Sequence, residues 1–414
     1  METLTPTPTS TRPDAVADVR LRPLPLLLGT AGPLWLVSAF FARLPVAVLP
    51  LAVLLHGQHL TGSFAVAGLM LAAMSLGAAL AAPIVGGLAD RWGPRRTILT
   101  MTGVATLAIS LLAAFAWVPG PPIAALVASA ALVGAGNAQI GAVARAAWST
   151  RFAREPHGPR KIEVALGYET VVDEVSFVVG PVIGATLATV VSPVAAILTA
   201  LAVLLVAQLG FASLVGGRSA ASGRPTRGPF SPRLAVWVVL SFLVGGVFGT
   251  VQTGLTASLA GTEHAPLTGA IYAFVGLGSA ISGMLTHLLH RWPLPRRAIV
   301  FGLGLAVMAS GLLGGGNLAL VIAACAGIGL CVAPLLVAAF TGAERLASAG
   351  STFVLTILSA ANVAGVGAGA AASGVVFDGY GPTAALALPI GLGVACAAVG
   401  TVALVVRADA SITR

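Results

Sequence analysis

Long apolar runs separated by short polar breaks dominate the chain. Each run has about 20 residues or more, the length that a helix needs to cross a hydrocarbon core roughly 30 Å thick. Because this core cannot solvate exposed backbone groups, the pattern predicts membrane helices joined by tight loops. The predicted spans are 30–55, 64–86, 97–117, 122–147, 164–190, 194–215, 234–257, 267–289, 298–315, 318–340, 352–376 and 382–406.

The composition agrees with this pattern. Of the 414 residues, 57% are hydrophobic and only 8% are charged, whereas about 25% are charged in a soluble domain. The 51 glycines and 26 prolines would weaken soluble helices, but membrane helices that pack through small residues tolerate them. The sequence therefore predicts an all-α membrane protein with twelve transmembrane helices.

The longest polar interruption inside the chain divides it into two halves. It covers residues 216–233 and is predicted to be a cytoplasmic linker. It separates a six-helix bundle over 24–215 from a second one over 234–406. The Thr- and Pro-rich segment 1–23 is predicted to be a disordered cytoplasmic tail, and 407–414 a second cytoplasmic tail.

The basic residues predict the orientation. The net charge is +9, and the Lys and Arg residues form short clusters between apolar runs, which argues against a nucleic-acid partner. If both termini are cytoplasmic, every Lys and Arg except Arg43 lies on the cytoplasmic side, while Glu263 and Asp378 lie opposite. This follows the positive-inside rule. Abundant Arg, Ala and Gly beside a single lysine, Lys161, indicate a bacterial inner membrane.

One polar stretch between the second and third spans has a distinctive pattern. It is predicted to be a gating loop whose residues are Gly86, Asp90, Arg91, Gly93, Arg95 and Arg96. A related stretch, 290–297, occupies the corresponding loop of the second half. Two such repeats, with a site between them, are typical of alternating-access transporters. The alternative is that these arginines only enforce the membrane topology.

These loop residues resemble the signature loop of the major facilitator superfamily. The resemblance implies the major facilitator fold, with two pseudo-symmetric six-helix bundles. The fifth span also resembles the helix-packing motif of bacterial drug/proton antiporters in that superfamily. The matching residues are Gly167, Ser176, Gly180, Pro181 and Gly184.

Five charged residues within spans are candidates for proton coupling in a central cavity: Arg43, Arg145, Glu169, Asp173 and Glu174. A charge at the centre of a span costs about 2.5–3.5 kcal/mol, so each should have a partner. Helical spacing places Glu169 and Asp173 on one face, with Glu174 turned away. We expect Arg145 to reach Glu169 or Asp173, and Arg43 to reach Asp173 or Glu174. A static network that fastens the first, fourth and fifth helices is the alternative.

Five uncharged polar residues in spans are possible substrate contacts: Asn137, Gln139, Gln252, Tyr272 and Asn362. Interhelical hydrogen bonds are the other explanation for them. The sequence contains no nucleotide-binding loop and no hydrolase or metalloprotease motif. We therefore expect no ATP, no metal, no cofactor and no enzymatic activity, with a proton gradient as the energy source.

Together these patterns predict a secondary active transporter, acting as a monomer in the lipid bilayer, that exports a small organic molecule in exchange for protons. Two alternatives remain open. The protein could be an importer or uniporter of a sugar, amino acid or organic anion, with Arg43 as the counter-ion of an anionic substrate. It could also be a non-transporting membrane sensor or scaffold.

Overall fold

The protein is built of helices. The structure is a computed structural model that describes residues 23–216, 232–314, 316–346 and 351–412, and every regular element in these ranges is a helix. Twelve segments are long and apolar enough to cross a membrane. The predicted all-α fold with twelve spans is confirmed.

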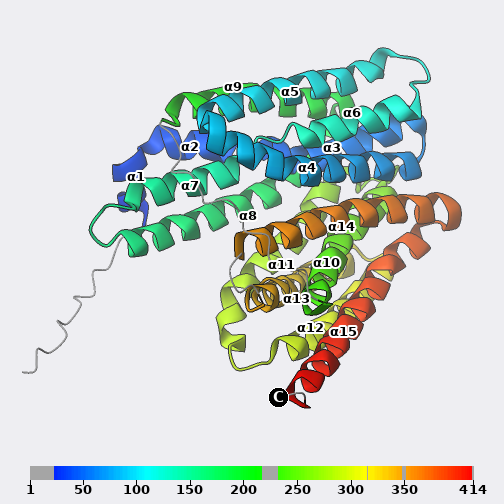
Figure 1. Cartoon of the computed structure of the whole chain (residues 1–414). Coiled ribbons are helices and arrows are strands. Elements are labelled where there is room, and N and C mark those ends of the chain that lie inside the picture. The colour runs from blue at the N-terminus through cyan, green and yellow to red at the C-terminus, as the bar shows by residue number, and fades with distance from the viewer. Residues whose placement is uncertain (1–22, 217–231, 315, 347–350, 413–414) are drawn as a thin grey trace, which may run out of the picture.

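The first half forms one bundle, at the top of Figure 1. Short 3₁₀ turns extend some helices of both halves. The helices of the first half are α1 (Pro23–Ala31), α2 (Pro33–Phe41), α3 (Leu44–Thr61), α4 (Phe64–Trp92), α5 (Pro94–Ala114), α6 (Ile123–Ala135), α7 (Ile140–Phe152), α8 (Gly158–Val190) and α9 (Pro193–Leu214).

The second half forms the other bundle. Its helices are α10 (Pro232–Leu259), α11 (Thr268–Leu285), α12 (Leu294–Ser310), α13 (Leu318–Glu344), α14 (Ser351–Tyr380) and α15 (Pro382–Ile412). The predicted tail 1–23 and linker 216–233 lie almost wholly outside the described residues. Helix α15 continues through most of the predicted second tail, to Ile412, beyond the last candidate span, which ends at Val405. The cytoplasmic location of this segment stays a prediction.

Two spans that we predicted as continuous helices are broken near their middle. The first span divides into α2 and α3 at Arg43, because Pro45 in the first turn of α3 has no N–H to continue the preceding helix. Gln208 of α9 donates to the carbonyl of Ala42, 3.2 Å away, and so satisfies an acceptor at this break. The fourth span divides into α6 and α7, where Gln139 has a left-handed φ of 51°.

A short helix before the first span was not predicted. Helix α1 ends at Ala31, and Gly32, with φ 79°, turns the chain into α2. Leu27 of α1 is fully buried in the apolar cluster that also contains Trp35. This packing explains why α1 is ordered although it is too short to cross a membrane.

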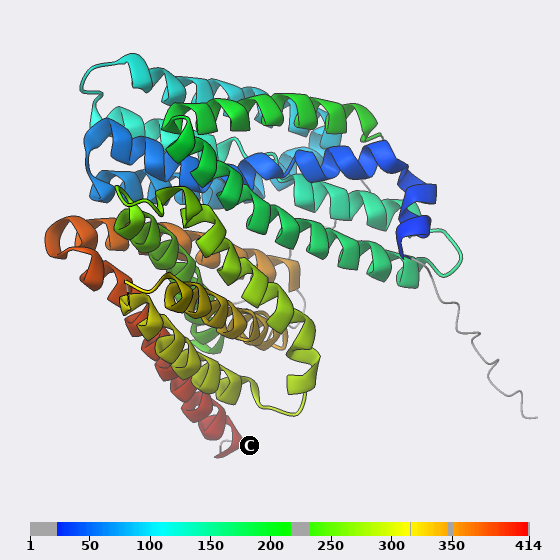
Figure 2. The same cartoon turned by 180° about the vertical axis from the view of Figure 1, so that it is seen from behind.

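The two halves contact each other through close backbone approaches. In α4, a side chain on Gly68 would overlap the carbonyl of Ala370 in α14. In α14, a side chain on Gly374 would overlap the carbonyl of Phe64 at the start of α4. Figures 1 and 2 show the halves meeting at this end and diverging toward the other. Small residues therefore bring the bundles together at one end.

A hydrogen-bonded carboxylate joins the halves at the same end. Asp378 of α14 accepts a hydrogen bond from the Ser63 hydroxyl at 2.6 Å. It also accepts from the backbone N–H groups of Phe64 and Ala65, at 3.2 and 2.9 Å. These N–H groups belong to the first turn of α4, which has no intrahelical acceptor for them. Asp378 thus caps a helix of the opposite half.

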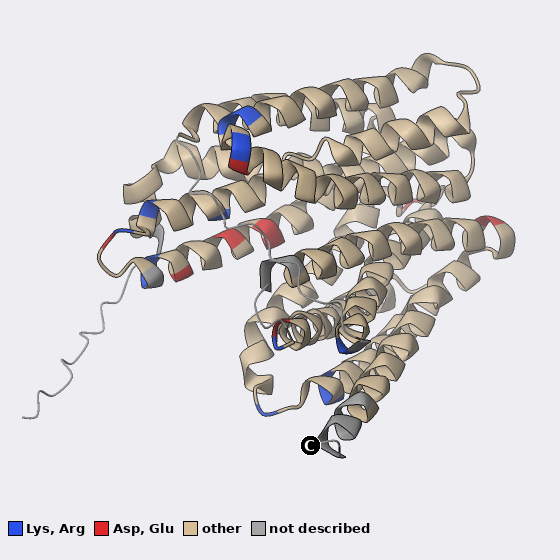
Figure 3. Ribbon diagram, in the orientation of Figure 1, with Lys and Arg blue, Asp and Glu red and all other residues tan. Residues whose placement is uncertain are grey.

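The basic residues mark the other end of the molecule. Figure 3 shows them at one end of each half, where the bundles diverge. They include Arg95 and Arg96 at the start of α5 and Arg296 at the start of α12. The end at which Asp378 joins the halves carries acids instead. The structure therefore has one basic end, where the two halves diverge, and one end where they are in contact.

Candidate functional site

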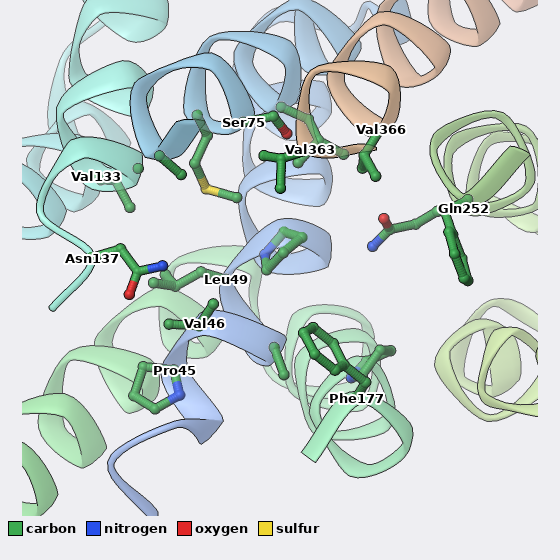
Figure 4. Close-up of a pocket in the computed structure, with 18 of the residues that line it drawn as sticks. Pro45, Val46, Leu49, Ser75, Val133, Asn137, Phe177, Gln252, Val363 and Val366 are labelled. Atoms are coloured by element: carbon green, nitrogen blue, oxygen red, sulfur yellow. The ribbon is translucent and has the colours of Figure 1, made fainter. Parts of the chain in front are cut away.

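A cavity of about 400 Å³ lies between the two halves. Side chains from both bundles line it, including Pro45 and Leu49 of α3, Phe248 of α10 and Val363 of α14. Figure 4 shows several of these side chains converging from helices of both halves. Its volume is in the range of small-molecule sites, about 300–1,000 Å³. A movement of one half against the other would therefore change the cavity.

Four of the five predicted substrate contacts line this cavity: Asn137, Gln252, Tyr272 and Asn362. Figure 4 shows the first two facing each other across it. The Asn362 amide also donates a hydrogen bond to the Ser241 carbonyl at 3.1 Å. This interhelical bond uses part of the hydrogen-bonding capacity of the Asn362 side chain. Their contact with a substrate stays a prediction.

Gln139 does not line the cavity. It lies in the break between α6 and α7, and its backbone N–H donates to the Asn137 side chain at 3.0 Å. The left-handed backbone turns it away from the position that a continuous helix would give it. Its contact with a substrate stays a prediction that the cavity does not support in this conformation.

An ion-pair network joins three helices of the first half. Arg43, at the α2–α3 break, pairs with Glu169 of α8, and Arg145 of α7 pairs with Asp173 of α8. Arg43 also lies 3.5 Å from Asp173. The Trp148 indole donates to Glu169 at 2.6 Å. Glu169 and Arg43 are 0% and 6% exposed, so this pair is removed from solvent.

This network differs in one respect from the prediction. We expected Arg43 to reach Asp173 or Glu174; it lies 3.5 Å from Asp173, as expected, but it also pairs with Glu169, which was not expected for it. The position of Arg43 in a helix break turns it toward the deeper acid of α8. Two arginines and two carboxylates therefore form a group with balanced charge.

Glu174 is the acid left outside this network. It lines the central cavity and is partly exposed there. Within the described residues no hydrogen bond or ion pair involves its carboxylate. The predicted helical face explains the difference, because Glu174 is turned away from Glu169 and Asp173 along α8. The cavity therefore holds a carboxylate without a cationic partner.

The residues of the predicted helix-packing motif lie on α8 and mainly contact helices of their own half. A side chain on Gly180 would overlap Ala47 of α3, and one on Gly184 would meet Val48. Ser176 is buried and its hydroxyl bonds the Val172 carbonyl at 2.8 Å. These two glycines therefore bring α8 close to α3 of the same half.

The remaining two motif residues behave differently from the glycines of that face. Pro181 meets the opposite half, because its carbonyl lies against Gly269 of α11. Gly167 has open space where a side chain would be. It therefore has no packing function in this conformation.

The predicted gating loop is a one-residue turn. Helix α4 continues to Trp92, past the predicted span end, and α5 begins at Pro94. Gly93 between them has φ 86°, a conformation that only glycine adopts easily. Gly86 and Asp90 thus lie in the last turns of α4. Their gating role stays a prediction.

The corresponding turn of the second half is built differently. Arg297 of α12 is buried, and its guanidinium donates to the carbonyls of Trp292 and Leu289. These carbonyls lie near the end of the preceding helix, where intrahelical donors are missing. In the second half, the guanidinium of Arg297 therefore stabilises the turn through these hydrogen bonds.

Sequence reasoning missed two residues that carry this arrangement. Trp148 lies about one turn after Arg145, and this spacing could have indicated that both face the acids of α8. Asp378 was recognised only as an acid on the side opposite the basic clusters. No local pattern relates it to Ser63 in the other half, so its capping role needed the structure.

Comparisons with known proteins agree with the geometry. A sequence model described as "Major Facilitator Superfamily" matches residues 35–354. The comparison with curated proteins finds no match. The matched region begins near the start of α2 and includes the cavity helices of both halves up to α13.

Solved transporter structures share the fold. The crystal structure of the nucleoside transporter NupG is 12% identical, with a TM-score of 0.71, and the match covers 90% of this chain and 99% of NupG. The crystal structure of the human organic anion transporter MFSD10 (TETRAN) is 18% identical, with a TM-score of 0.56, and the match covers 92% and 100%. At these identities the likeness shows the fold alone.

Proposed function

Because this chain belongs to the Major Facilitator Superfamily, whose model matches most of its length, we propose that it exports a small organic molecule in exchange for protons. The protein is a membrane transporter and not an enzyme. In the proposal it acts as a monomer in a bacterial inner membrane, with both termini in the cytoplasm. The proton gradient supplies the energy, without a cofactor.

One observation carries the proposal: a cavity between the halves contains one acid without a cationic partner. Glu174 lines this cavity beside a network whose charges are already balanced. A carboxylate in such a place changes its charge when a proton binds, and its surroundings change when the halves move. Proton binding at Glu174 can therefore be linked to the conformation of the protein.

The positions of the basic clusters give the orientation that the proposal uses. With the basic end in the cytoplasm, the cavity lies between halves that diverge toward the cytoplasm (Figures 1 and 3). In this conformation an exporter collects its substrate and an importer releases it, so export remains the proposed direction and uptake into inverted vesicles tests it. In the same proposal the turn around Gly93 closes this end in the opposite conformation.

Import of an anion has less support. That alternative uses Arg43 as a counter-ion, but Arg43 does not line the cavity and is paired with Glu169. Releasing it would leave a carboxylate that is 0% exposed without its partner. Such a loss costs about 3–5 kcal/mol. Arg43 therefore has a structural function in this proposal.

Glu174→Gln tests the coupling. We expect uptake driven by a pH gradient in inverted vesicles to fall at least about tenfold, because glutamine cannot release a proton. The substrate is a compound that a thermal-shift screen of the purified protein selects, since a bound ligand raises the apparent stability.

Glu163→Gln is the matched control, because Glu163 is an exposed acid of the same helix. Uptake should then be unchanged. Full pH-driven uptake by Glu174→Gln, at equal protein levels, would exclude Glu174 as the coupling residue.

The Asp378 contacts predict a second effect. Alternating access requires that the closed end opens, so the hydrogen bonds from Ser63, Phe64 and Ala65 to Asp378 must break. We expect Asp378→Asn to weaken this closure by about 1 kcal/mol, because the helix N-terminus loses a negative charge. The equilibrium should shift about fivefold toward the state open at this end.

Spin labels at the exposed positions His59 and Tyr380 report this shift. A larger fraction of the molecules should show a long distance between the two labels. Glu263→Gln, an exposed acid near the same end of the second half, is the control. An unchanged distance distribution in Asp378→Asn would show that the carboxylate does not stabilise the closed end.

A further inference from the structure

We propose that Arg151, a partly buried arginine at the basic end of the first half, binds the phosphate group of an anionic phospholipid. This inference goes beyond the proposed function, because it assigns a ligand outside the central cavity and depends neither on the substrate nor on the coupling residue. Three observations carry it: a cation without a counter-ion, free backbone donors beside it, and a position at the surface of the membrane.

The first observation is that Arg151 has no anionic partner. Its side chain is partly buried near the end of α7, and within the described residues no hydrogen bond or ion pair involves its guanidinium. The acid of the following turn, Glu155, is paired with Lys161 at 2.9 Å. A cation that is partly removed from water is stabilised by a counter-ion. The described part of the chain does not supply one to Arg151.

Two tryptophan rings fix the position of this guanidinium. The Cζ atom of Arg151 lies 4.9 Å from the centre of the Trp35 ring and 5.5 Å from the centre of the Trp148 ring. Both tryptophans are buried, and a hydrogen bond to Glu169 holds the Trp148 indole. Such contacts stabilise a cation but leave its charge in place. The guanidinium is therefore preorganised and still able to bind an anion.

The start of α2 adds backbone donors to the same place. Trp35 belongs to the first turn of α2, and helical side chains lean toward the N-terminus of their helix, so its ring holds Arg151 near this start. The N-cap residue, Gly32, offers no side-chain acceptor. The N–H groups of Leu34 and Trp35 have no acceptor among the described residues. Free N–H groups at a helix N-terminus favour a phosphate.

The position of these donors favours a lipid over a soluble anion. Arg151 is next to the end of a candidate span, at Phe152, and lies at the end of the molecule that carries the basic residues (Figure 3). Lipid phosphates lie at this depth, just outside the hydrocarbon core. Helix α1 packs against α2 and α8 beside this group and exposes Leu28. An acyl chain can cover such an apolar side chain while its phosphate reaches Arg151.

Lipid binding to the purified protein tests the assignment. The probes are phosphatidylglycerol, phosphatidylcholine with the same acyl chains, and inorganic phosphate, and native mass spectrometry from a neutral detergent measures the bound fraction. We expect the wild type to bind phosphatidylglycerol at least about tenfold more tightly than phosphatidylcholine, whose choline cation offsets the phosphate charge. Arg151→Gln should lose this preference. Arg151→Lys should keep part of it, because lysine retains the charge but not the planar fork.

Arg154→Gln is the matched control, because Arg154 is an exposed arginine of the turn that follows α7 and its loss changes the net charge equally. It should bind both lipids like the wild type. The thermal unfolding midpoint without added lipid shows whether each variant is folded, and Arg151→Lys serves if Arg151→Gln is not.

Three results would overturn the lipid site: no preference for phosphatidylglycerol in the wild type, an unchanged preference in folded Arg151→Gln, or an equal loss in Arg154→Gln. Inorganic phosphate that bound as tightly as phosphatidylglycerol would assign the site to a soluble anion and overturn the assignment to a lipid. None of these results bears on proton-coupled export, because the experiment measures neither transport nor the central cavity.

Discussion

Arg43→Gln is expected to destabilise the protein by about 3–5 kcal/mol, because it leaves a buried carboxylate without its cation. Glu169 is 0% exposed, and after the substitution only the Trp148 indole would remain as a strong partner. The second acid, Asp173, would keep Arg145. The expected measurement is a clear fall in the thermal unfolding midpoint of the purified protein.

The double variant Arg43→Gln, Glu169→Gln separates this cause from a general packing defect. It removes both buried charges, so most of the lost stability should return. Lys161→Gln is the control, because it breaks a partly exposed pair with Glu155, 2.9 Å apart, and such pairs contribute about 0–1 kcal/mol. If the double variant were no more stable than Arg43→Gln alone, the uncompensated charge would not be the reason.

Gly68→Leu is expected to reduce transport at least about tenfold while each half still folds. A side chain at this position would overlap the Ala370 carbonyl of α14. A backbone atom cannot move away by rotation of a side chain, so the two helices would have to separate. The variant should therefore be unable to close the end that Asp378 joins.

Uptake driven by a pH gradient measures the loss of transport. Spin labels at His59 and Tyr380 should show that the end joined by Asp378 stays open. Gly103→Leu is the matched control, because Gly103 of α5 has open space where its side chain would be. Normal uptake by Gly68→Leu, or the same loss in Gly103→Leu, would contradict the requirement for close contact between α4 and α14.

The chemistry of the candidate site was only partly predictable. The charged residues in the spans were identified because any charge in a span is costly. Their assignment to partners was incomplete, because the break at Arg43 turns its side chain toward Glu169. The distinction between the paired acids and the free acid, Glu174, required the positions of α3 and α7 around α8.

The sequence by itself determined the number of spans, the all-α fold, the presence of a turn between the second and third spans, and the family. These properties depend on local hydrophobicity, length and short motifs, which can be read along the chain. The tertiary structure alone decided that Asp378 caps α4, that small residues join α4 to α14, and that Glu174 remains in the cavity without a cation. The reason is physical: these relations join residues far apart in sequence, and they depend on how each helix is rotated, broken and packed against its neighbours.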